Sequence, residues 1–264
     1  MPTTSSVKFN IRKFDLSKMS SDAVIVMLAK RRSGKSYLCR DILYNQRKIP
    51  DGVVISPTEK ASPYYRNFIP EIFIYDDYSP EIVAKLLKRQ EKRIQKRRSD
   101  DNRTFLVMDD CLYDNKWVKD VPIRNIFMNG RHYKVMYLLL MQYPLGITPA
   151  LRSNIDYVFL LKEPNLSNRK RLYEHYAGVF PTFDMFSETL DKLTEDYSCM
   201  VIDNTSRMGK IEDSVFWYKA QERKDFRVGG ESYWKYHDTK FDKNYKKRQL
   251  GVGIKKKFII KMEN

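Results

Sequence analysis

The chain has 264 residues, of which 42% are hydrophobic and 31% are charged, enough apolar content for one large domain or two small ones. No apolar run approaches the roughly 20 residues of a membrane-spanning helix, and the amino-terminal segment lacks the pattern of a secretory signal, so we expect a soluble protein. The 49 basic residues outnumber the 33 acidic ones and give a net charge of +16, which is typical of proteins with a polyanionic partner but equally compatible with a merely basic protein.

Apolar, β-rich segments alternate along the chain with longer helical patterns. The predicted strands are 23–28, 53–56, 73–75, 104–108, 135–141 and 157–161. The predicted helices are 35–45, 80–98, 119–129 and 167–176. Several strands are nearly continuous apolar runs, as in parallel sheets covered on both faces, so the alternation predicts a doubly wound α/β sheet. Two later apolar runs, 199–202 and 215–220, extend the sheet as an edge hairpin.

We divide the chain into a core domain, residues 1–220, and a basic extension, residues 221–264, rich in lysine and aromatic residues. Two segments are strongly basic: 85–98 and the tail 235–264. In the tail, Tyr233, Trp234, Tyr236 and Tyr245 lie among or just before the lysines. Lysine with aromatic residues suits a strand of nucleic acid, through phosphate contacts and base stacking. A solvated helix face and a disordered tail are the alternative interpretations.

The stretch 29–36, AKRRSGKS, lies between the first predicted strand and the first predicted helix. It matches the phosphate-binding loop pattern G-x-x-x-x-G-K-[ST], except that Ala29 replaces the first glycine with another small residue. Gly34 lets the backbone approach a phosphate, Lys35 reaches the β- and γ-phosphates, and Ser36 offers a hydroxyl to Mg²⁺. The predicted nucleotide-binding residues are Ala29, Lys30, Arg31, Arg32, Ser33, Gly34, Lys35, Ser36 and Tyr37.

Two further apolar strands end in polar residues. The strand at 104–108 is followed by Asp109 and Asp110. A P-loop ATPase needs an acidic residue for Mg²⁺ at the tip of another buried strand, a role that fits Asp109, and Asp110 is then the candidate general base. The strand at 135–141 is followed by Gln142, a candidate contact for the γ-phosphate or the attacking water. Taken singly, the aspartate pair and the glutamine are each also compatible with an ordinary turn after a strand.

Taken together, segments 29–36, 105–111, 129–144 and 151–163 resemble the FtsK–HerA superfamily of DNA-translocating ATPases. The closest likeness is to the genome-packaging ATPases of large nucleocytoplasmic DNA viruses, the poxvirus-type packaging ATPase group. The resemblance spans about residues 22–176 and implies a RecA-like ASCE core with strand order 5-1-4-3-2. It also implies ATP and Mg²⁺ as ligands, with Lys35 and Ser36 as Walker A residues and Asp109 as the Walker B residue.

The resemblance assigns roles to three more side chains. The sensor glutamine of the family falls on Gln142, and FtsK-type members usually carry a glutamate where this chain has the shorter Asp110. In FtsK-like motors, an arginine eleven residues before the glutamine reaches the nucleotide of the neighbouring subunit, which corresponds to Arg131. Arg152 is the second candidate for this arginine finger. A structural pairing of Arg152 with Asp156, or with a helix carboxyl terminus, is the alternative.

The resemblance also implies partners and a location. The expected assembly is a homo-oligomeric ring, a pentamer or hexamer, that drives double-stranded DNA into a capsid, with capsid or membrane vertex proteins as further partners. The expected location is the virion or a cytoplasmic virus factory of the host. Cys39, Cys111 and Cys199 form neither a disulfide framework nor a zinc pattern, so we expect a reducing compartment.

Two other functions remain open from the sequence. A small-molecule P-loop kinase, acting on a nucleoside or nucleotide, has a suitable size and loop, but it usually carries an arginine-rich lid, and the strand that ends in Gln142 argues against it. A non-enzymatic nucleic-acid-binding protein with a degenerate P-loop is favoured by the missing first glycine. The intact Gly34, Lys35 and Ser36 argue against this second alternative.

Overall fold

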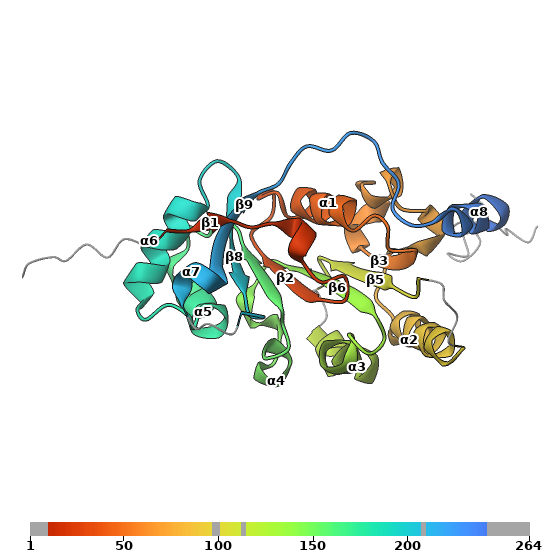
Figure 1. Cartoon of the computed structure of the whole chain (residues 1–264), viewed down its shortest axis with the longest axis horizontal. Helices are drawn as coiled ribbons and strands as arrows, with labels where there is room; N and C mark the ends of the chain where they lie inside the picture. Colours follow the sequence, from red (N-terminus) through yellow and green to blue (C-terminus); the bar gives the residue numbers. More distant parts are fainter. Residues whose placement is uncertain (1–9, 97–100, 112–114, 207–209, 242–264) are drawn as a thin grey trace, which may run out of the picture.

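The computed structural model describes residues 10–96, 101–111, 115–206 and 210–241 (Figure 1). Within these residues one sheet holds nine strands in the order β1-β9-β8-β7-β2-β6-β5-β3-β4. The strands are β1 (Arg12–Lys13), β2 (Val24–Leu28), β3 (Asp51–Ile55), β4 (Ile74–Tyr75), β5 (Thr104–Asp109), β6 (Val135–Met141), β7 (Tyr157–Leu160), β8 (Ser198–Asp203) and β9 (Val215–Lys219). The helices are α1 (Lys35–Asn45), α2 (Pro80–Gln95), α3 (Val121–Asn129), α4 (Pro149–Arg152), α5 (Leu166–Tyr176), α6 (Phe183–Leu193), α7 (Ile211–Ser214) and α8 (Glu231–Lys240).

The order of the central strands confirms the predicted RecA-like arrangement. Strands β7, β2, β6, β5 and β3 lie side by side and are parallel, which gives 5-1-4-3-2 when these five are counted in chain order. The predicted edge hairpin is also present, because β8 is antiparallel to β7 and β9 is antiparallel to β8. The short β1, which the sequence analysis missed, pairs in parallel with β9.

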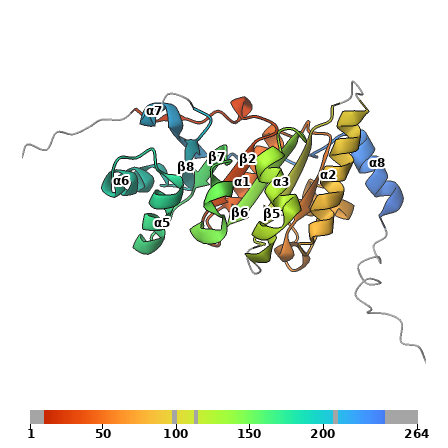
Figure 2. The same cartoon turned by 90° about the horizontal axis from the view of Figure 1, so that it is seen from below.

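Burial on both faces explains why the strands are apolar throughout. All five residues of β2 are buried, and alternate side chains enter two different cores. Val24, Val26 and Leu28 pack in the core beneath α2 and α3, whereas Ile25 and Met27 pack in the core beneath α1. Figure 2 looks onto the face that α2 and α3 cover, and α1 lies behind the sheet. Each such side chain contributes about 1.5–3 kcal/mol when it is fully buried.

The four predicted helices are present and differ from the predictions at their ends, whereas α4, α6, α7 and α8 were not predicted. The predicted helix 119–129 begins at Val121, because Pro122 occupies the first turn, where its missing N–H costs nothing. Helix α6 was not predicted, although Thr182 caps it by accepting from the backbone N–H of Met185. Phe186 and Leu190, one turn apart, bury its inner face. No helix in the described part of the chain is both long and apolar enough to cross a bilayer.

The segment 220–230 crosses over α1 from β9 to α8, at opposite ends of the sheet (Figure 1). Asp41 of α1, which is fully buried, anchors its first half. The Asp41 carboxylate accepts from the hydroxyl of Tyr218 at 2.7 Å, the backbone N–H of Gln221 at 2.8 Å and Nε of Arg223 at 2.7 Å. These bonds fix the segment across α1, so the start of the predicted extension is part of the folded structure.

Helix α8 also packs against the core. The Tyr233 ring stacks on Phe73, and its hydroxyl donates to the carbonyl of Gly52 at 2.8 Å. Because Tyr233 is buried, its ring is not available to stack on a nucleic-acid base, contrary to that reading of the sequence. Most of the predicted basic tail, including Tyr245 and the lysine-rich stretches 246–248 and 255–257, lies in 242–264, outside the described residues.

Candidate active site

Four parallel strands end at the same edge of the sheet, and the predicted loop 29–37, Asp109, Asp110 and Gln142 gather there. The backbone N–H of Ala29, just after β2, donates to the carbonyl of Met141 at 3.1 Å. On the other side of β2, the N–H of Leu161 donates to the carbonyl of Leu28 at 3.1 Å. The chain order reverses at β2, between β6 and β7, and open α/β sheets bind ligands at such a point.

The loop 29–34 leads from β2 into α1 and has the backbone of an anion-binding turn. Arg32, at φ 60°, and Gly34, at φ 93°, are both left-handed, and such residues turn successive N–H groups toward one side. Gly34 is the amino-terminal cap of α1, and apart from its two chain neighbours no described residue has an atom within 4 Å of where its Cβ would stand. Ser33 closes the loop by donating its hydroxyl to the carbonyl of Lys30 at 2.5 Å. The helix amino terminus and the open space beside Gly34 therefore fit a phosphate group.

Lys35 is held inside this loop. Its side chain is buried, at 8% exposure, and Nζ donates to the carbonyls of Ala29 at 2.8 Å and Lys30 at 3.1 Å. Burial lowers the pKa of Lys35, and the nearby carboxylates of Asp109 and Asp110 act in the opposite direction. The ammonium group is thus positioned beside the loop by weak, neutral acceptors that an anion can replace.

Asp109 lies beside Ser36, as a shared metal site requires. Its Oδ2 accepts from the Ser36 hydroxyl at 3.2 Å and from the Tyr65 hydroxyl at 2.8 Å. Asp109 is only 5% exposed, and burial raises its pKa, while the hydrogen bonds from Tyr65 and Ser36 and the charge of Lys35 lower it. A carboxylate and a hydroxyl are oxygen ligands of the type that Mg²⁺ takes together with nucleotide phosphates. The donor set therefore fits the predicted metal.

Asp110 and Gln142 form a second pair at the same edge. Gln142 Nε2 donates to Asp110 Oδ1, so the two predicted catalytic side chains are in direct contact. Asp110 has φ 58°, a left-handed conformation that is uncommon outside glycine and often marks functional positions. This backbone turn follows directly after Asp109, so adjacent residues present two carboxylates at the site.

Tyr65 is a site residue that the sequence analysis missed. It is fully buried, and its hydroxyl binds the same oxygen of Asp109 as Ser36 does. Glu59, also buried, accepts from the backbone N–H groups of Tyr64 at 2.9 Å and Tyr65 at 3.0 Å and so fixes this turn. Tyr65 thus acts as a positioning residue for the Asp109 carboxylate.

We expect Tyr65→Phe to raise the Mg²⁺ concentration needed for half-maximal nucleotide turnover several-fold, because the variant frees the Asp109 carboxylate to rotate. The lost hydrogen bond should lower the free energy of unfolding by about 1 kcal/mol. Tyr137→Phe is the matched control, since Tyr137 is also buried but its hydroxyl donates to Met108 Sδ, at 3.2 Å. A Mg²⁺ titration of turnover that shifts equally in both variants would contradict the positioning role.

Glu163 is the second missed residue. It follows β7, is buried, and pairs through Oε1 with Nζ of Lys30 at 3.3 Å. The same carboxylate is fixed by the backbone N–H of Asn165 at 2.9 Å and by Asn168 Nδ2 at 3.3 Å. Glu163 therefore ties the phosphate-binding loop to the end of the neighbouring strand.

A cavity of about 390 Å³ opens beside the loop, within the size range of small-molecule sites. Its walls come from the loop and the start of α1, the end of β7, the start of β8 and the end of β9. The lining residues are Arg32, Gly34, Tyr37, Leu38, Leu161, Tyr197, Cys199, Lys219 and Ala220. The cavity combines apolar and aromatic walls with basic side chains next to the phosphate-binding loop.

Neither predicted arginine-finger candidate makes a hydrogen bond or ion pair to these site residues within the described part of the chain. Arg131 precedes β6, and its side chain, 65% exposed, pairs with Asp156 Oδ1. Since β6 has seven residues, Arg131 and Gln142 are separated by the length of a strand, about 20 Å. Arg152 donates to the carbonyl of Ile147 at 2.5 Å and lies over the Tyr176 ring. The pairing with Asp156 considered for Arg152 is therefore made by Arg131 instead.

Similar proteins are found by sequence and by structure. The chain is 45% identical to protein L437 of Acanthamoeba polyphaga mimivirus over 246 residues, which covers 90% of this chain and 86% of L437. It is 38% identical to protein 015R of Frog virus 3, over 82% of this chain and 68% of that protein. No protein-family model matches the chain.

Two solved structures share the fold. The genome-packaging NTPase B204 of Sulfolobus turreted icosahedral virus 2, in complex with ATP-gammaS, has a TM-score of 0.54 at 17% identity and covers 77% of this chain and 100% of its own. B204 of Sulfolobus turreted icosahedral virus, described as a DNA-packaging ATPase, has a TM-score of 0.57 at 15% identity with the same coverage. The shared architecture is that of RecA-like P-loop ATPases.

Proposed function

This chain belongs to the family of large-DNA-virus proteins that includes L437 of Acanthamoeba polyphaga mimivirus, and we propose that it is an ATP-hydrolysing motor that moves double-stranded viral DNA into a capsid. The observation that carries the proposal is the meeting of the 29–34 loop, Asp109, Asp110 and Gln142 at one sheet edge. The likeness in fold to B204, a viral genome-packaging NTPase, supports the same function. Within the FtsK–HerA superfamily, we assign the chain to the poxvirus-type packaging ATPases.

The proposed reaction transfers the γ-phosphoryl group of ATP to water. The bond from the γ-phosphorus to the oxygen that it shares with the β-phosphate breaks, a bond to the water oxygen forms, and a water proton leaves. Lys35 neutralises the β- and γ-phosphate oxygens, while Asp110 orients the water and accepts its proton. Gln142, in contact with Asp110, responds to the presence of the γ-phosphate. Positioning and electrostatic stabilisation supply most of the catalysis in such reactions.

The cofactor and the rest of the nucleotide also have proposed places. Ser36 and Asp109 would hold Mg²⁺, which when bound neutralises charge on the β- and γ-phosphates. The 390 Å³ cavity takes the base and ribose, with Tyr37 and Tyr197 as candidate stacking partners. Lys30, Arg31 and Arg32 are exposed on the loop and add positive charge around the phosphates.

The motor is proposed to work as a ring of five or six copies. Arg131 lies at the edge of the sheet opposite its own nucleotide site, so it can act only on a neighbouring subunit in a head-to-tail ring. There the guanidinium would leave Asp156 and stabilise charge on the γ-phosphate. Capsid or membrane vertex proteins complete the assembly in the virion or in a cytoplasmic virus factory.

The fate of the γ-phosphate tests the proposed chemistry. Radiolabelled ATP is incubated with the full chain, with and without a panel of nucleosides and nucleotides. The proposal predicts release of inorganic phosphate that is independent of these acceptors and increased by long duplex DNA. If the label is found in a nucleoside or nucleotide, the protein is a kinase and the proposal is wrong. Nucleotide binding without any turnover would support a non-enzymatic nucleic-acid-binding protein.

A further inference from the structure

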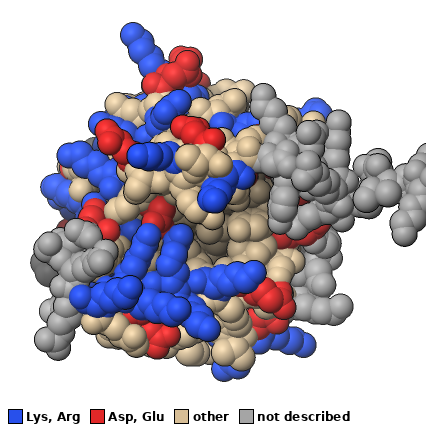
Figure 3. Space-filling view, turned by 90° about the vertical axis from the view of Figure 1, so that its right-hand side faces the viewer, with Lys and Arg blue, Asp and Glu red and all other residues tan. Residues whose placement is uncertain are grey.

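A second cavity, of about 550 Å³, lies at the other edge of the sheet, away from the nucleotide site. One wall is the last turns of α2 and its carboxyl-terminal cap, which contribute Arg89, Lys92, Arg93 and Lys96. The other wall includes Asp51, the first residue of β3, and Ser232 of α8. Figure 3 views the end of the molecule where α2 and α8 lie and shows a dense cluster of Lys and Arg side chains. We call this cavity the α2–α8 groove.

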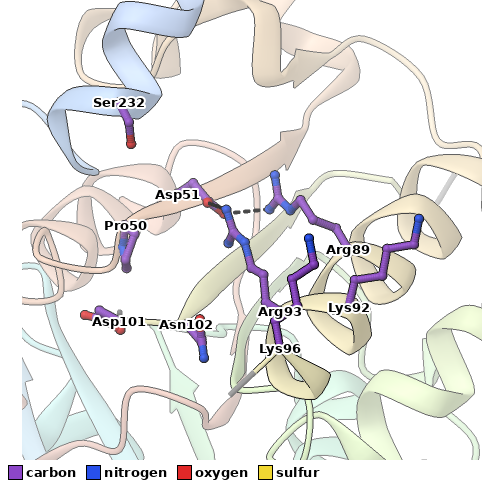
Figure 4. Close-up of a pocket in the computed structure, with 9 residues that line it drawn as sticks. All are labelled: Pro50, Asp51, Arg89, Lys92, Arg93, Lys96, Asp101, Asn102 and Ser232. Carbon is purple, nitrogen blue, oxygen red and sulfur yellow. Dashed lines mark hydrogen bonds and ion pairs between the residues drawn. The ribbon is translucent and has the colours of Figure 1, made fainter. Parts of the chain in front are cut away.

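The charges in the α2–α8 groove do not balance, because its four cations face two carboxylates, Asp51 and Asp101, and Asp101 already pairs with Arg103. Asp51 holds Arg89 at 2.5 Å and Arg93 at 2.6 Å, so one carboxylate orients two guanidinium groups (Figure 4). Neither Lys92 nor Lys96 has an acidic partner within ion-pair distance among the residues that the structure describes. Nε of Arg89 is buried and has no hydrogen-bond partner within the described part of the chain. The groove therefore has spare positive charge, as an anion-binding site requires.

The basic surface continues beyond the groove along one face of α2. Lys85 and Lys88 precede the four groove cations with the three- and four-residue spacing that places side chains on one helix face. From Lys85 to Lys96 the row is about 16 Å long, at 1.5 Å per residue. Successive phosphates of one DNA strand advance about 3.4 Å along the duplex, so the row spans about five of them. A single small anion would leave most of this row unused.

The composition of the groove favours nucleic acid over an acidic protein. Pro50 is the only apolar residue in its lining among the described residues. Protein partners usually anchor in a groove through buried aromatic or aliphatic side chains, for which this lining offers no pocket. Lys92 and Lys96 are exposed point charges on flexible stems, which suit phosphates without reading base sequence.

We propose that the α2–α8 groove and the basic face of α2 bind the phosphate backbone of duplex DNA. The choice of DNA as the polyanion rests on the proposed function, whereas the charge surplus and its geometry do not. In this assignment Asp51 keeps Arg89 and Arg93 directed into the groove, and Lys92 and Lys96 supply the free charges. Binding is independent of sequence and weakens with salt.

The test is the affinity of the full chain for a labelled duplex of about 30 base pairs, measured by fluorescence anisotropy at several salt concentrations. The test variant is Lys92→Glu/Lys96→Glu, which leaves the Asp51 ion pairs in place. The control is Lys192→Glu/Lys210→Glu, with the same change of net charge at the α6–α7 end of the molecule (Figure 1). We expect the test variant to bind the duplex at least about tenfold more weakly than the wild type. The slope of log affinity against log salt concentration should fall by an amount that corresponds to about two phosphate contacts, and the affinity of the control should change much less.

Several outcomes would overturn the assignment. If DNA binding weakens equally in both variants, the effect comes from the net charge of the chain and not from the groove. If DNA binding is unchanged in the test variant, the groove is not a DNA-binding site. If poly-glutamate binds the wild type and loses affinity only in the test variant, while DNA binding is unaffected, the groove takes an acidic protein. ATP hydrolysis without DNA is measured in parallel and should be equal in all three chains. Its absence from the wild type would count against the proposed function and not against the groove.

Discussion

Lys35→Ala is expected to lower ATP turnover at least about 100-fold while the protein stays folded, the size of effect that follows removal of one preorganised charge-stabilising group. The Lys35 ammonium is buried beside the loop and bonded only to two carbonyls, so it is free to turn to a bound phosphate. Among the described residues, Lys35 is the one buried cation near Asp109, and the substitution removes it from the site. Steady-state turnover and binding of a fluorescent ATP analogue measure the effect.

The matched control for this prediction is Lys48→Ala, which removes an exposed lysine just beyond the other end of α1. We expect turnover of the control within about twofold of the wild type, since exposed substitutions away from a site rarely matter. Thermal unfolding of both variants shows whether loss of turnover reflects loss of fold. A Lys35→Ala protein that hydrolyses ATP normally would remove the 29–34 loop from the reaction.

Arg131→Ala is expected to lower turnover by about 1,000-fold or more and to leave nucleotide binding almost unchanged, as for arginine fingers supplied by a neighbour. The reason is geometric, because Arg131 stands a full strand length from the Gln142 end of its own site. Mixing Arg131→Ala with Lys35→Ala subunits should therefore restore part of the activity. In the mixture, an intact loop of one chain meets an intact Arg131 of the other.

Two further variants separate this role from a structural one. Asp156 binds Arg131 through one oxygen and the backbone N–H of Val24, at 2.8 Å, through the other, so the pair also fastens the start of β2. Asp156→Asn keeps an acceptor for Val24 but weakens the ion pair, and it should retain turnover. If Arg131→Ala only destabilises the fold and mixing restores nothing, Arg131 is structural, and the same mixing experiment on Arg152→Ala tests the second candidate.

The sequence predicted the features that follow from local chemistry. The strands of the central sheet were recognisable because both faces are buried, which makes β2 and β6 apolar at every position. The loop was recognisable because Gly34, Lys35 and Ser36 each have a separate task at fixed spacing. The convergence of Asp109 and Gln142 followed from parallel strands, whose carboxyl ends share one edge. The structure brings these residues together, and their catalytic roles remain predictions.

Other features depend on contacts between distant segments. Tyr65 reaches Asp109 across 44 residues of sequence, from a turn that Glu59 fixes, and no local pattern marks it. Glu163 was within reach of sequence reasoning, because it follows a parallel strand at the same edge as Gln142. The α2–α8 groove brings together β3, α2 and α8. Tyr233 of α8, predicted to stack on a base, packs on Phe73 instead.

Movement along DNA is the central claim, and a triplex-displacement assay tests it most directly. A labelled third strand is placed on a long duplex, and its release is followed after ATP is added to the full chain. We expect release that requires ATP hydrolysis, is delayed as the distance to the third strand increases, and is lost in Lys35→Ala. Hydrolysis by an assembled, DNA-bound wild type without any release of the third strand would contradict a translocating motor.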